Sequence, residues 1–206
     1  MAEAAAFVSA RAAEACGGAG RPAFAVAFSL GGPVIRHAAS SGEESSEGPL
    51  WQGSVLLAAP NRGSDLAREL LRGASTPRVV RRLFRFLYGP AVVDLASPRE
   101  EIERTWPDAP RPCGVIAGTA PRSLNPASLL LASRVFSGGG KGRRGESRDG
   151  TSPPPRVHDG TVAVDETKLP LPADDFATVH AGHTFIADRK ETAELVAAFL
   201  TKGRFF

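Results

Sequence analysis

Apolar positions in the first forty residues follow two different periods. Residues 3–16 are rich in alanine and repeat apolar side chains at helical spacing, and the Gly17–Gly18 pair that follows can end a helix. Residues 23–28, AFAVAF, are apolar on both faces, which is typical of a strand buried in a parallel sheet. The next segment, SLGGPVIRHAAS, accommodates Pro33 in the first turn of a helix. The pattern predicts a helix, a buried strand, a tight turn and a second helix.

The same alternation continues downstream. Further buried strands are predicted at 54–59, 113–118 and 176–180, and a closing helix at 191–203 ends near its glycine. Strands that alternate with helices indicate an α/β fold with a mostly parallel sheet flanked by helices. Two more helical stretches, at about 64–72 and 77–88, lie between the second and third strands. Two helices are more than one simple crossover between strands needs, so we expect a small helical cap within about 64–95.

The chain is long enough for one domain. With 206 residues, of which 42% are hydrophobic, we expect a single domain over 1–206. Residues 137–156 contain glycine, serine, proline and charge with almost no apolar side chain, and are predicted to be a disordered insertion. A functional basic tail is the alternative, carried by Lys141, Arg143, Arg144 and Arg148. Glu146 and Asp149 interrupt that charge, so we favour a solvated loop.

Charge and cysteine content exclude several classes of function. A net charge of +3 with 7% aromatic residues offers no basic stacking platform, so nucleic-acid binding is not expected. Cys16 and Cys113 have no zinc-ligand or disulfide spacing, and no metal site is expected. The N-terminus lacks the basic lead of a secretory signal, and no apolar stretch reaches the length of a membrane span. A cytoplasmic location is therefore expected.

Ser29 is the candidate nucleophile. It stands in Ala27-Phe28-Ser29-Leu30-Gly31, between a predicted buried strand and a predicted helix, where a strand–turn–helix elbow exposes a serine hydroxyl. We expect Ala27 and Gly31 to be small because larger side chains would collide as the turn tightens. The alternative interpretation is that Ser29 only caps the following helix.

An acid and a base follow in the chain order Ser, Asp, His. Asp159 begins the phrase DGTV, and His183 lies in GHTF just beyond the last predicted strand. Carboxyl ends of neighbouring parallel strands converge, so loop residues there can reach one serine. We favour His183 over His180, which is expected to be the last strand residue.

The remaining histidines and acids receive other interpretations. His37 and His158 are expected to be surface or packing residues, and His158 directly precedes the proposed acid. Asp174 and Asp175 compete with Asp159, but both precede the final strand and fit solvated turn positions.

In the order of its phrases the chain resembles bacterial-type lipase/esterase-like α/β hydrolases. The matching phrases are SLGG at the elbow, Ala59–Ser64 (APNRGS), Gly114–Gly118 (GVIAG), Arg122–Pro126 (RSLNP), Asp159–Val162 (DGTV), Gly182–Phe185 (GHTF) and Gly203–Phe205 (GRF). The resemblance implies an α/β-hydrolase fold and ester hydrolysis without a cofactor. The substrate would be a small-molecule or lipid ester.

The chain also departs from these relatives. Their elbow follows several strands and an HG-containing loop that supplies one oxyanion-hole amide, whereas here 28 residues precede Ser29 and contain no such loop. We therefore expect a partial α/β-hydrolase fold in which the Leu30 N–H is the remaining oxyanion donor. Missing strands would expose a sheet edge, which favours association or instability. Phe28 occupies a position where the relatives often have histidine.

One basic amphipathic helix is predicted over 77–88. Arg78, Arg81, Arg82 and Arg85 share one face, and Val80, Leu83, Phe84 and Leu87 lie largely on the other. We favour a cap helix packed over the domain; a lid that contacts a membrane surface is the alternative.

Two functions follow from these observations. The first is a serine ester hydrolase in which Ser29 attacks, His183 transfers the proton, Asp159 orients His183 and the Leu30 N–H stabilises the oxyanion. The second is a catalytically impaired hydrolase relative with a binding role only, which the missing oxyanion loop favours. A basic adaptor for nucleic acid or membrane is a third alternative.

Overall fold

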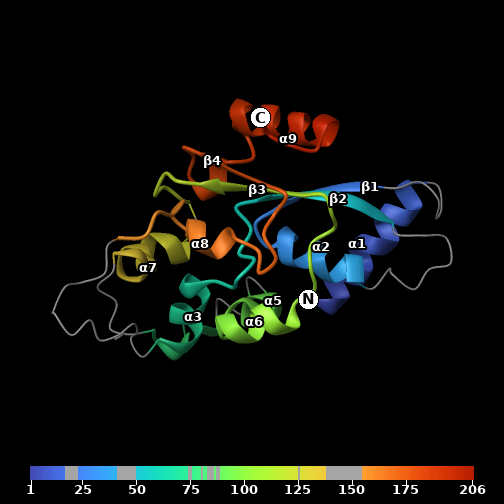
Figure 1. Cartoon of the computed structure of the whole chain (residues 1–206). Helices are drawn as coiled ribbons and strands as arrows, with labels where there is room; N and C mark the ends of the chain where they lie inside the picture. The colour runs from blue at the N-terminus through green and yellow to red at the C-terminus, as the bar shows by residue number, and fades with distance from the viewer. Residues whose placement is uncertain are drawn as a thin grey trace.

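The structure is a computed structural model of the whole chain (Figure 1). It describes residues 1–16, 23–40, 50–73, 76–79, 81–82, 86, 89–124, 126–137 and 155–206. Half of the predicted helix at 77–88 and most of the predicted insertion at 137–156 lie outside these ranges.

Four parallel strands form one sheet in the order β1-β2-β3-β4. The strands are β1 (Ala23–Phe28), β2 (Trp51–Leu57), β3 (Cys113–Gly118) and β4 (Asp175–Val179). The predicted α/β fold with a parallel sheet is confirmed, and so are the four strands. The second strand ends earlier than expected, because Ala58 adopts a positive φ of 46° that an extended strand does not continue.

Helices cover the two faces of the sheet unequally (Figure 1). On one face α2 (Gly31–Ser40) packs on β1 and β2, and α1 (Ala2–Ala15) packs on α2. On the other face lies α9 (Lys190–Lys202), which ends at Gly203 with a left-handed φ of 71°. The strands lie in the sheet in their chain order, and right-handed crossovers between successive strands then all pass over the same face. A helix that follows the last strand, such as α9, is not a crossover and can cover the opposite face.

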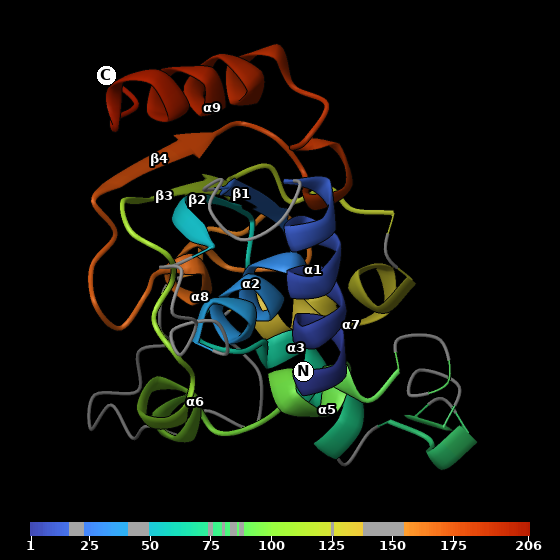
Figure 2. The same ribbon diagram turned by 90° about the vertical axis from the view of Figure 1, so that its right-hand side faces the viewer.

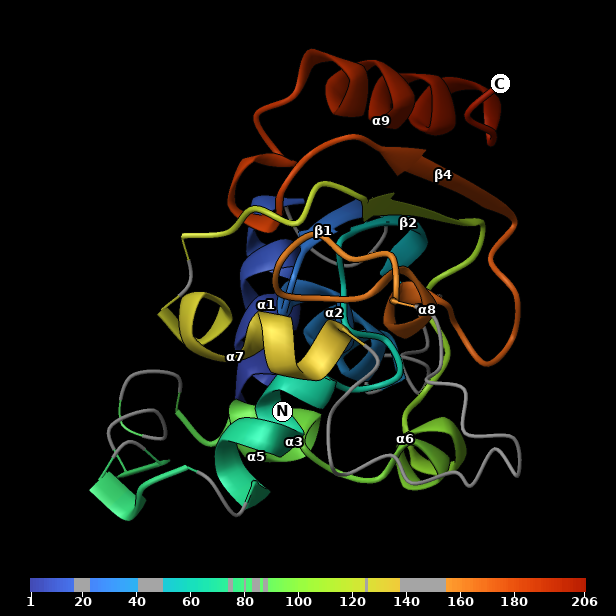
Figure 3. The ribbon, with the colours of Figure 1, turned by 90° about the vertical axis from the view of Figure 1, so that its left-hand side faces the viewer.

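The remaining helices lie on the α2 side of the sheet (Figures 2 and 3). They are α3 (Asp65–Arg72), α5 (Ala91–Leu95), α6 (Arg99–Thr105), α7 (Pro126–Phe136) and α8 (Val164–Thr167). The 3₁₀ helix η1 (His183–Phe185) follows β4. The Ser64 hydroxyl caps α3 by accepting the Ala67 N–H at 3.2 Å, and α3 contacts α5 and α7. Helix α3 confirms the helix expected at 64–72. No helix of the described ranges has the length and apolar content that a bilayer crossing requires.

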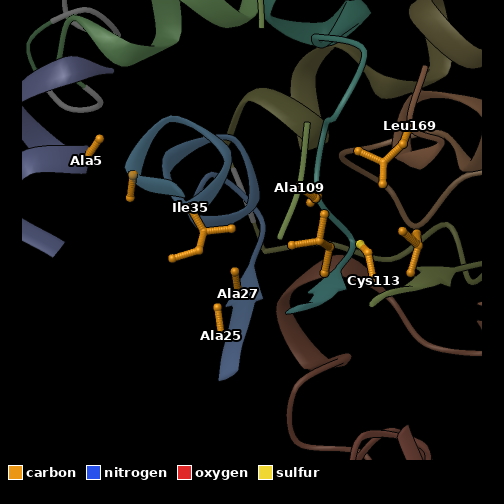
Figure 4. Packing of buried hydrophobic residues seen from close by; sticks show 11 residues of the cluster. Ala5, Ala25, Ala27, Ile35, Ala109, Cys113 and Leu169 are labelled. Carbon is orange, nitrogen blue, oxygen red and sulfur yellow. The ribbon is translucent and has the colours of Figure 1, made fainter. Parts of the chain in front are cut away.

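The apolar core is divided by the sheet. On the α2 side, small residues of β1, Ala25 and Ala27, let α2 and its Ile35 approach closely (Figure 4). On the α9 side, Phe199 packs with Phe205 over β3. A Cβ at Gly114 would lie 2.7 Å from the Phe205 ring, so this position of β3 needs glycine.

Strand β1 is less buried than its sequence predicts. Ala25 and Ala27 are buried, but Phe24, Val26 and Phe28 on the opposite face are 43%, 49% and 39% exposed. The expectation of burial on both faces was wrong because the α9-side core covers β2, β3 and β4 and does not include β1. Within the described residues β1 pairs only with β2, so its other edge is open.

Candidate active site

Ser29 lies on a strained turn at the carboxyl end of β1. Its φ is 51°, a conformation that side chains other than glycine rarely adopt, and its N–H donates to Leu57 O at 2.8 Å. Helix α2 begins two residues later at Gly31. A positive φ between a strand and a helix is the backbone arrangement of a nucleophile elbow.

The elbow packs on the chain that leaves β2. A Cβ at Gly32 would overlap the Cβ of Ala59, whereas a Cβ at Gly31 would lie 3.6 Å from Ala27 Cβ, an ordinary contact. Gly31 thus has room for a methyl group, contrary to the expectation that it must be small. The close approach falls one residue later, at Gly32, because that residue faces the neighbouring strand end.

The structure brings Ser29, His183 and Asp159 together. The Ser29 Oγ lies 2.9 Å from His183 Nε2, and His183 Nδ1 lies 2.8 Å from Asp159 Oδ2. Asp159 is 1% exposed and His183 is 7% exposed. A hydroxyl, an imidazole and a buried carboxylate in series can remove a proton from the serine and stabilise the resulting imidazolium.

A tight loop directs the Asp159 carboxylate. Its Oδ1 accepts the Thr161 N–H at 2.9 Å and the Val162 N–H at 2.7 Å, which leaves Oδ2 for His183. The Asp159 carbonyl accepts the His183 N–H at 2.8 Å, so the loops of the acid and the base are joined by backbone as well. The Thr161 and Val162 amides were not predicted, although the DG-x-V phrase marks the turn that supplies them.

Two glycines bring these loops close to the sheet. A Cβ at Gly118 would lie 2.7 Å from Asp159 Cβ, and one at Gly182 would overlap the Arg122 carbonyl oxygen. Gly182 directly precedes the base His183 in the sequence. Position 118 needs glycine because Asp159 approaches it in space, and the sequence of β3 does not reveal this approach.

The other histidines lie away from Ser29 in separate packing environments. His180 follows the end of β4, is exposed, and lies 3.5 Å from Thr119 Oγ1. His37 packs edge-on against Trp106, and burial followed by the charge of Arg36 lowers its pKa.

His158 stacks on Phe136 with ring centroids 4.3 Å apart, and burial lowers its pKa. Asp174 and Asp175 lie at the amino-terminal end of β4, where their carboxylates accept the Cys113 and Phe205 N–H groups at 2.6 Å. That end of the sheet is opposite Ser29, so neither acid lies at the elbow.

The Leu30 N–H lies at the start of α2, next to the serine. Among the described residues no acceptor takes this N–H, while the Leu30 carbonyl already accepts the Val34 N–H at 3.2 Å. The amino-terminal end of a helix also favours negative charge. An N–H at this position can donate to an anion bound beside Ser29, which is the role that the sequence predicts for Leu30.

Phe28 also belongs to this site. Its ring lies 5.1 Å from the His183 ring, with the planes tilted by 38°. The sequence position of Phe28, directly before the serine, was the signal that it lies near the base.

A cavity of about 460 Å³ lies elsewhere, at the amino-terminal ends of β2 and β3. Trp51, Pro107 and Arg111 are among its lining residues. Because Ser29 follows the opposite end of β1, this cavity does not belong to the elbow. No group of three or more His, Cys, Asp or Glu side chains suited to a metal occurs in the described ranges.

Solved structures of bacterial lipase share this architecture. The mature form of Bacillus licheniformis lipase BlEst2 superposes with a TM-score of 0.62 at 17% identity, over 96% of this chain and 72% of the lipase chain. Its propeptide form gives a TM-score of 0.57 at 17% identity, over 88% of this chain and 36% of that one.

The chain has a partial α/β-hydrolase fold. The resemblance noted in the sequence is thus confirmed at the level of the fold, since identity this low carries the architecture alone. No protein-family profile and no curated protein matches the sequence. Open parallel sheets bind their ligands at the carboxyl ends of the strands. Ser29 and His183 lie at that end of this sheet.

Proposed function

We propose that this protein is a serine hydrolase that cleaves carboxylic esters through an acyl-enzyme intermediate. The observation that carries the proposal is the continuous chain of contacts from Ser29 Oγ through the His183 ring to Asp159 Oδ2, at 2.9 and 2.8 Å. The positive φ of Ser29 supports it, because strained backbone persists where tertiary structure maintains it and is concentrated at active sites.

The chemistry needs no cofactor. His183 Nε2 takes the hydroxyl proton as Ser29 Oγ forms a bond to the ester carbonyl carbon, and the carbonyl oxygen becomes an oxyanion near the Leu30 N–H. When the intermediate collapses, the ester C–O bond breaks and His183 returns the proton to the leaving alcohol. Water then repeats these steps on the acyl-enzyme and frees the acid and Ser29.

Apolar side chains near the site support an ester with an apolar acyl group. Phe28 contacts the His183 ring and is 39% exposed, and Phe185 in the same 3₁₀ helix as His183 is 41% exposed. Leu124 is 65% exposed, and its N–H donates to the Thr184 hydroxyl next to Phe185. The likeness to a lipase structure agrees with this substrate class.

A catalytically impaired relative with a binding role is the second candidate. The observation that favours it is the oxyanion site, where Leu30 is the one donor that we assign among the described residues. Losing one of two donors lowers turnover by about 10²–10³. Such a protein would retain the elbow and the fold but would turn over esters slowly or not at all.

A fluorophosphonate probe distinguishes the two candidates. We expect the folded protein to be labelled at Ser29, Ser29→Ala to abolish labelling, and p-nitrophenyl esters to be hydrolysed by the same variants. Ser40→Ala, on the exposed last turn of α2, is the matched control and should be labelled like wild type. Folded protein that is neither labelled nor active contradicts the hydrolase proposal and favours the binding role.

A further inference from the structure

Glu166 is a fully buried carboxylate outside the Ser29, His183 and Asp159 site. Its exposed fraction is 0%, and each oxygen accepts a backbone N–H: Oε2 from Ala163 at 2.8 Å and Oε1 from Asp65 at 2.6 Å. The two donors belong to different segments, the end of the acid loop and the first turn of α3. One side chain therefore joins the acid loop to the start of α3, about a hundred residues away in the sequence.

The Ala163 bond fastens the loop that carries Asp159. Residues 158–163 form a closed turn in which the Asp159 N–H donates to Val162 O at 3.1 Å and His158 bridges to Ala163. The Val162 N–H, one residue before Ala163, is the closest amide donor to Asp159 Oδ1 at 2.7 Å. A shift of Ala163 would therefore move an amide that directs the carboxylate toward His183.

The other side of Glu166 is joined to the chain that leaves β2. The Arg62 N–H donates to Glu166 O at 3.0 Å, and the Asn61 amide donates to Thr167 O at 2.6 Å. Asn61 O in turn accepts from Arg36 of α2 at 2.7 Å. This path connects the acid loop with the helix that begins at the Ser29 elbow.

Charged neighbours surround the Glu166 carboxylate. The nearest cation is Arg156, at 3.8 Å, which also pairs with Asp65 and Asp165. Burial, followed by the charge of Asp65, raises the pKa of Glu166 to about 7, while Arg156 and the two backbone donors act in the opposite direction. Measurements at about pH 9 keep the group ionised.

We propose that Glu166 is a positioning residue for Asp159: by holding Ala163 against the start of α3, it keeps the Asp159 carboxylate in line with His183. The inference rests on the proposed function, in which Asp159 orients the base. Glu166 also occupies the third position of α8 and returns to the N–H before that helix, which is half of a capping box. A purely structural cap would affect stability without acting through Asp159.

A double-mutant cycle separates positioning from capping. Glu166→Gln replaces one accepting oxygen by an NH₂ group and leaves a buried N–H without an acceptor. We expect kcat and the rate of fluorophosphonate labelling to fall about tenfold with KM unchanged. In an Asp159→Asn background the same change should lower the labelling rate less than about twofold, because the carboxylate through which Glu166 acts is gone.

Asp165→Asn is the matched control. Asp165 is the neighbouring acid and belongs to the same ion-pair cluster through Arg99 and Arg156, but its carboxylate accepts no N–H of the acid loop. It should leave the labelling rate unchanged. An equal loss in Asp165→Asn, an equal loss in both Asp159 backgrounds, or no loss in Glu166→Gln overturns the proposal.

A second variant and a second readout keep the test independent of folding and activity. If Glu166→Gln does not fold, Ala163→Pro removes the N–H that binds Oε2, at a φ of −82° that is close to the range of proline, and adds ring atoms at a buried position. The readout that needs no activity is the downfield NMR signal of the proton between His183 Nδ1 and Asp159. Loss of this signal in the variant, with the signal present in wild type, supports positioning. An unchanged signal in the variant, or a signal that is already absent from wild type, overturns it. Wild-type protein that shows the signal but no labelling contradicts the proposed function alone.

Discussion

Ser29 Oγ and His183 Nε2 lie 2.9 Å apart although 154 residues separate them in the chain. The parallel sheet explains this short distance, because Ser29 follows β1 and His183 follows β4, and both strands end at the same, carboxyl, end of the sheet. The contact depends on local geometry at both ends: the positive φ of Ser29 and the hydrogen bond from His183 N–H to Asp159 O. The predictions below test the site and the packing that supports it.

Asp159→Asn should lower kcat by about 10⁴ with little effect on KM, because an amide favours the wrong tautomer of the histidine in a triad of this kind. Steady-state hydrolysis of a p-nitrophenyl ester measures the effect. Asp188→Asn, at an exposed turn, is the matched control and should retain activity. Equal activities of the two variants would show that Asp159 does not orient the base.

Gly32→Ala should lower the free energy of unfolding by about 1–3 kcal/mol, since the added Cβ would overlap Ala59 Cβ. Gly31→Ala adds the same methyl group where the nearest side-chain atom is 3.6 Å away, and should change stability by less than about 0.5 kcal/mol. Urea unfolding of both variants measures the difference. Equal stabilities would contradict the close approach of α2 to the chain after β2.

Asp65 should contribute stability that acid removes. Burial alone would raise its pKa, but Arg68 and Arg156 lower it to about 2, below the ordinary value of 3.8. A lowered pKa stabilises the fold above the unfolded value and loses this effect as the pH falls through about 2. The contribution at neutral pH is about 1–2 kcal/mol.

The measurement is the difference in unfolding free energy between wild type and Asp65→Asn from neutral pH to about pH 2. The difference should shrink as the pH falls. Asp188 is exposed, so the unfolding free energy of Asp188→Asn should differ from that of wild type by the same small amount at every pH in this range. A pH-independent difference for Asp65→Asn would refute the role of its charge.

Val26→Lys should reduce self-association. Val26 is 49% exposed on a strand whose second edge is open in the described structure, and lysine on an edge strand discourages pairing with another chain. Light scattering at increasing concentration measures the effect. Val93→Lys makes the same substitution at a 38% exposed position of α5 and should leave association unchanged. Similar scattering by both variants would show that the β1 edge is not the contact.

Much of the site was predictable because it depends on local patterns. Ser29 was identified from a buried strand followed by small residues and a helix, and Asp159 and His183 from their positions near the last strands. The confirmed strands and the closing helix follow from the same hydrophobic periods. The roles of the three residues in catalysis remain predictions that the experiments above address.

Other features could not be predicted, because they depend on which segments meet in space. The exposure of Phe24 and Val26 follows from the position of α9, which lies over strands later in the chain. Gly32 needs its small size because of Ala59, and Glu166 binds the first turn of a helix that is distant in sequence.

The sequence by itself determined the helices, the strands and a short list of serine, acid and histidine candidates, since periodicity and turn chemistry are local. The tertiary structure decided how His183, which the sequence favoured over His180, reaches Ser29. The physical reason is the turn after β4. His180 directly follows the strand and is exposed, whereas the His183 N–H, three residues later, donates to the Asp159 carbonyl, and this bond holds the His183 ring toward the elbow.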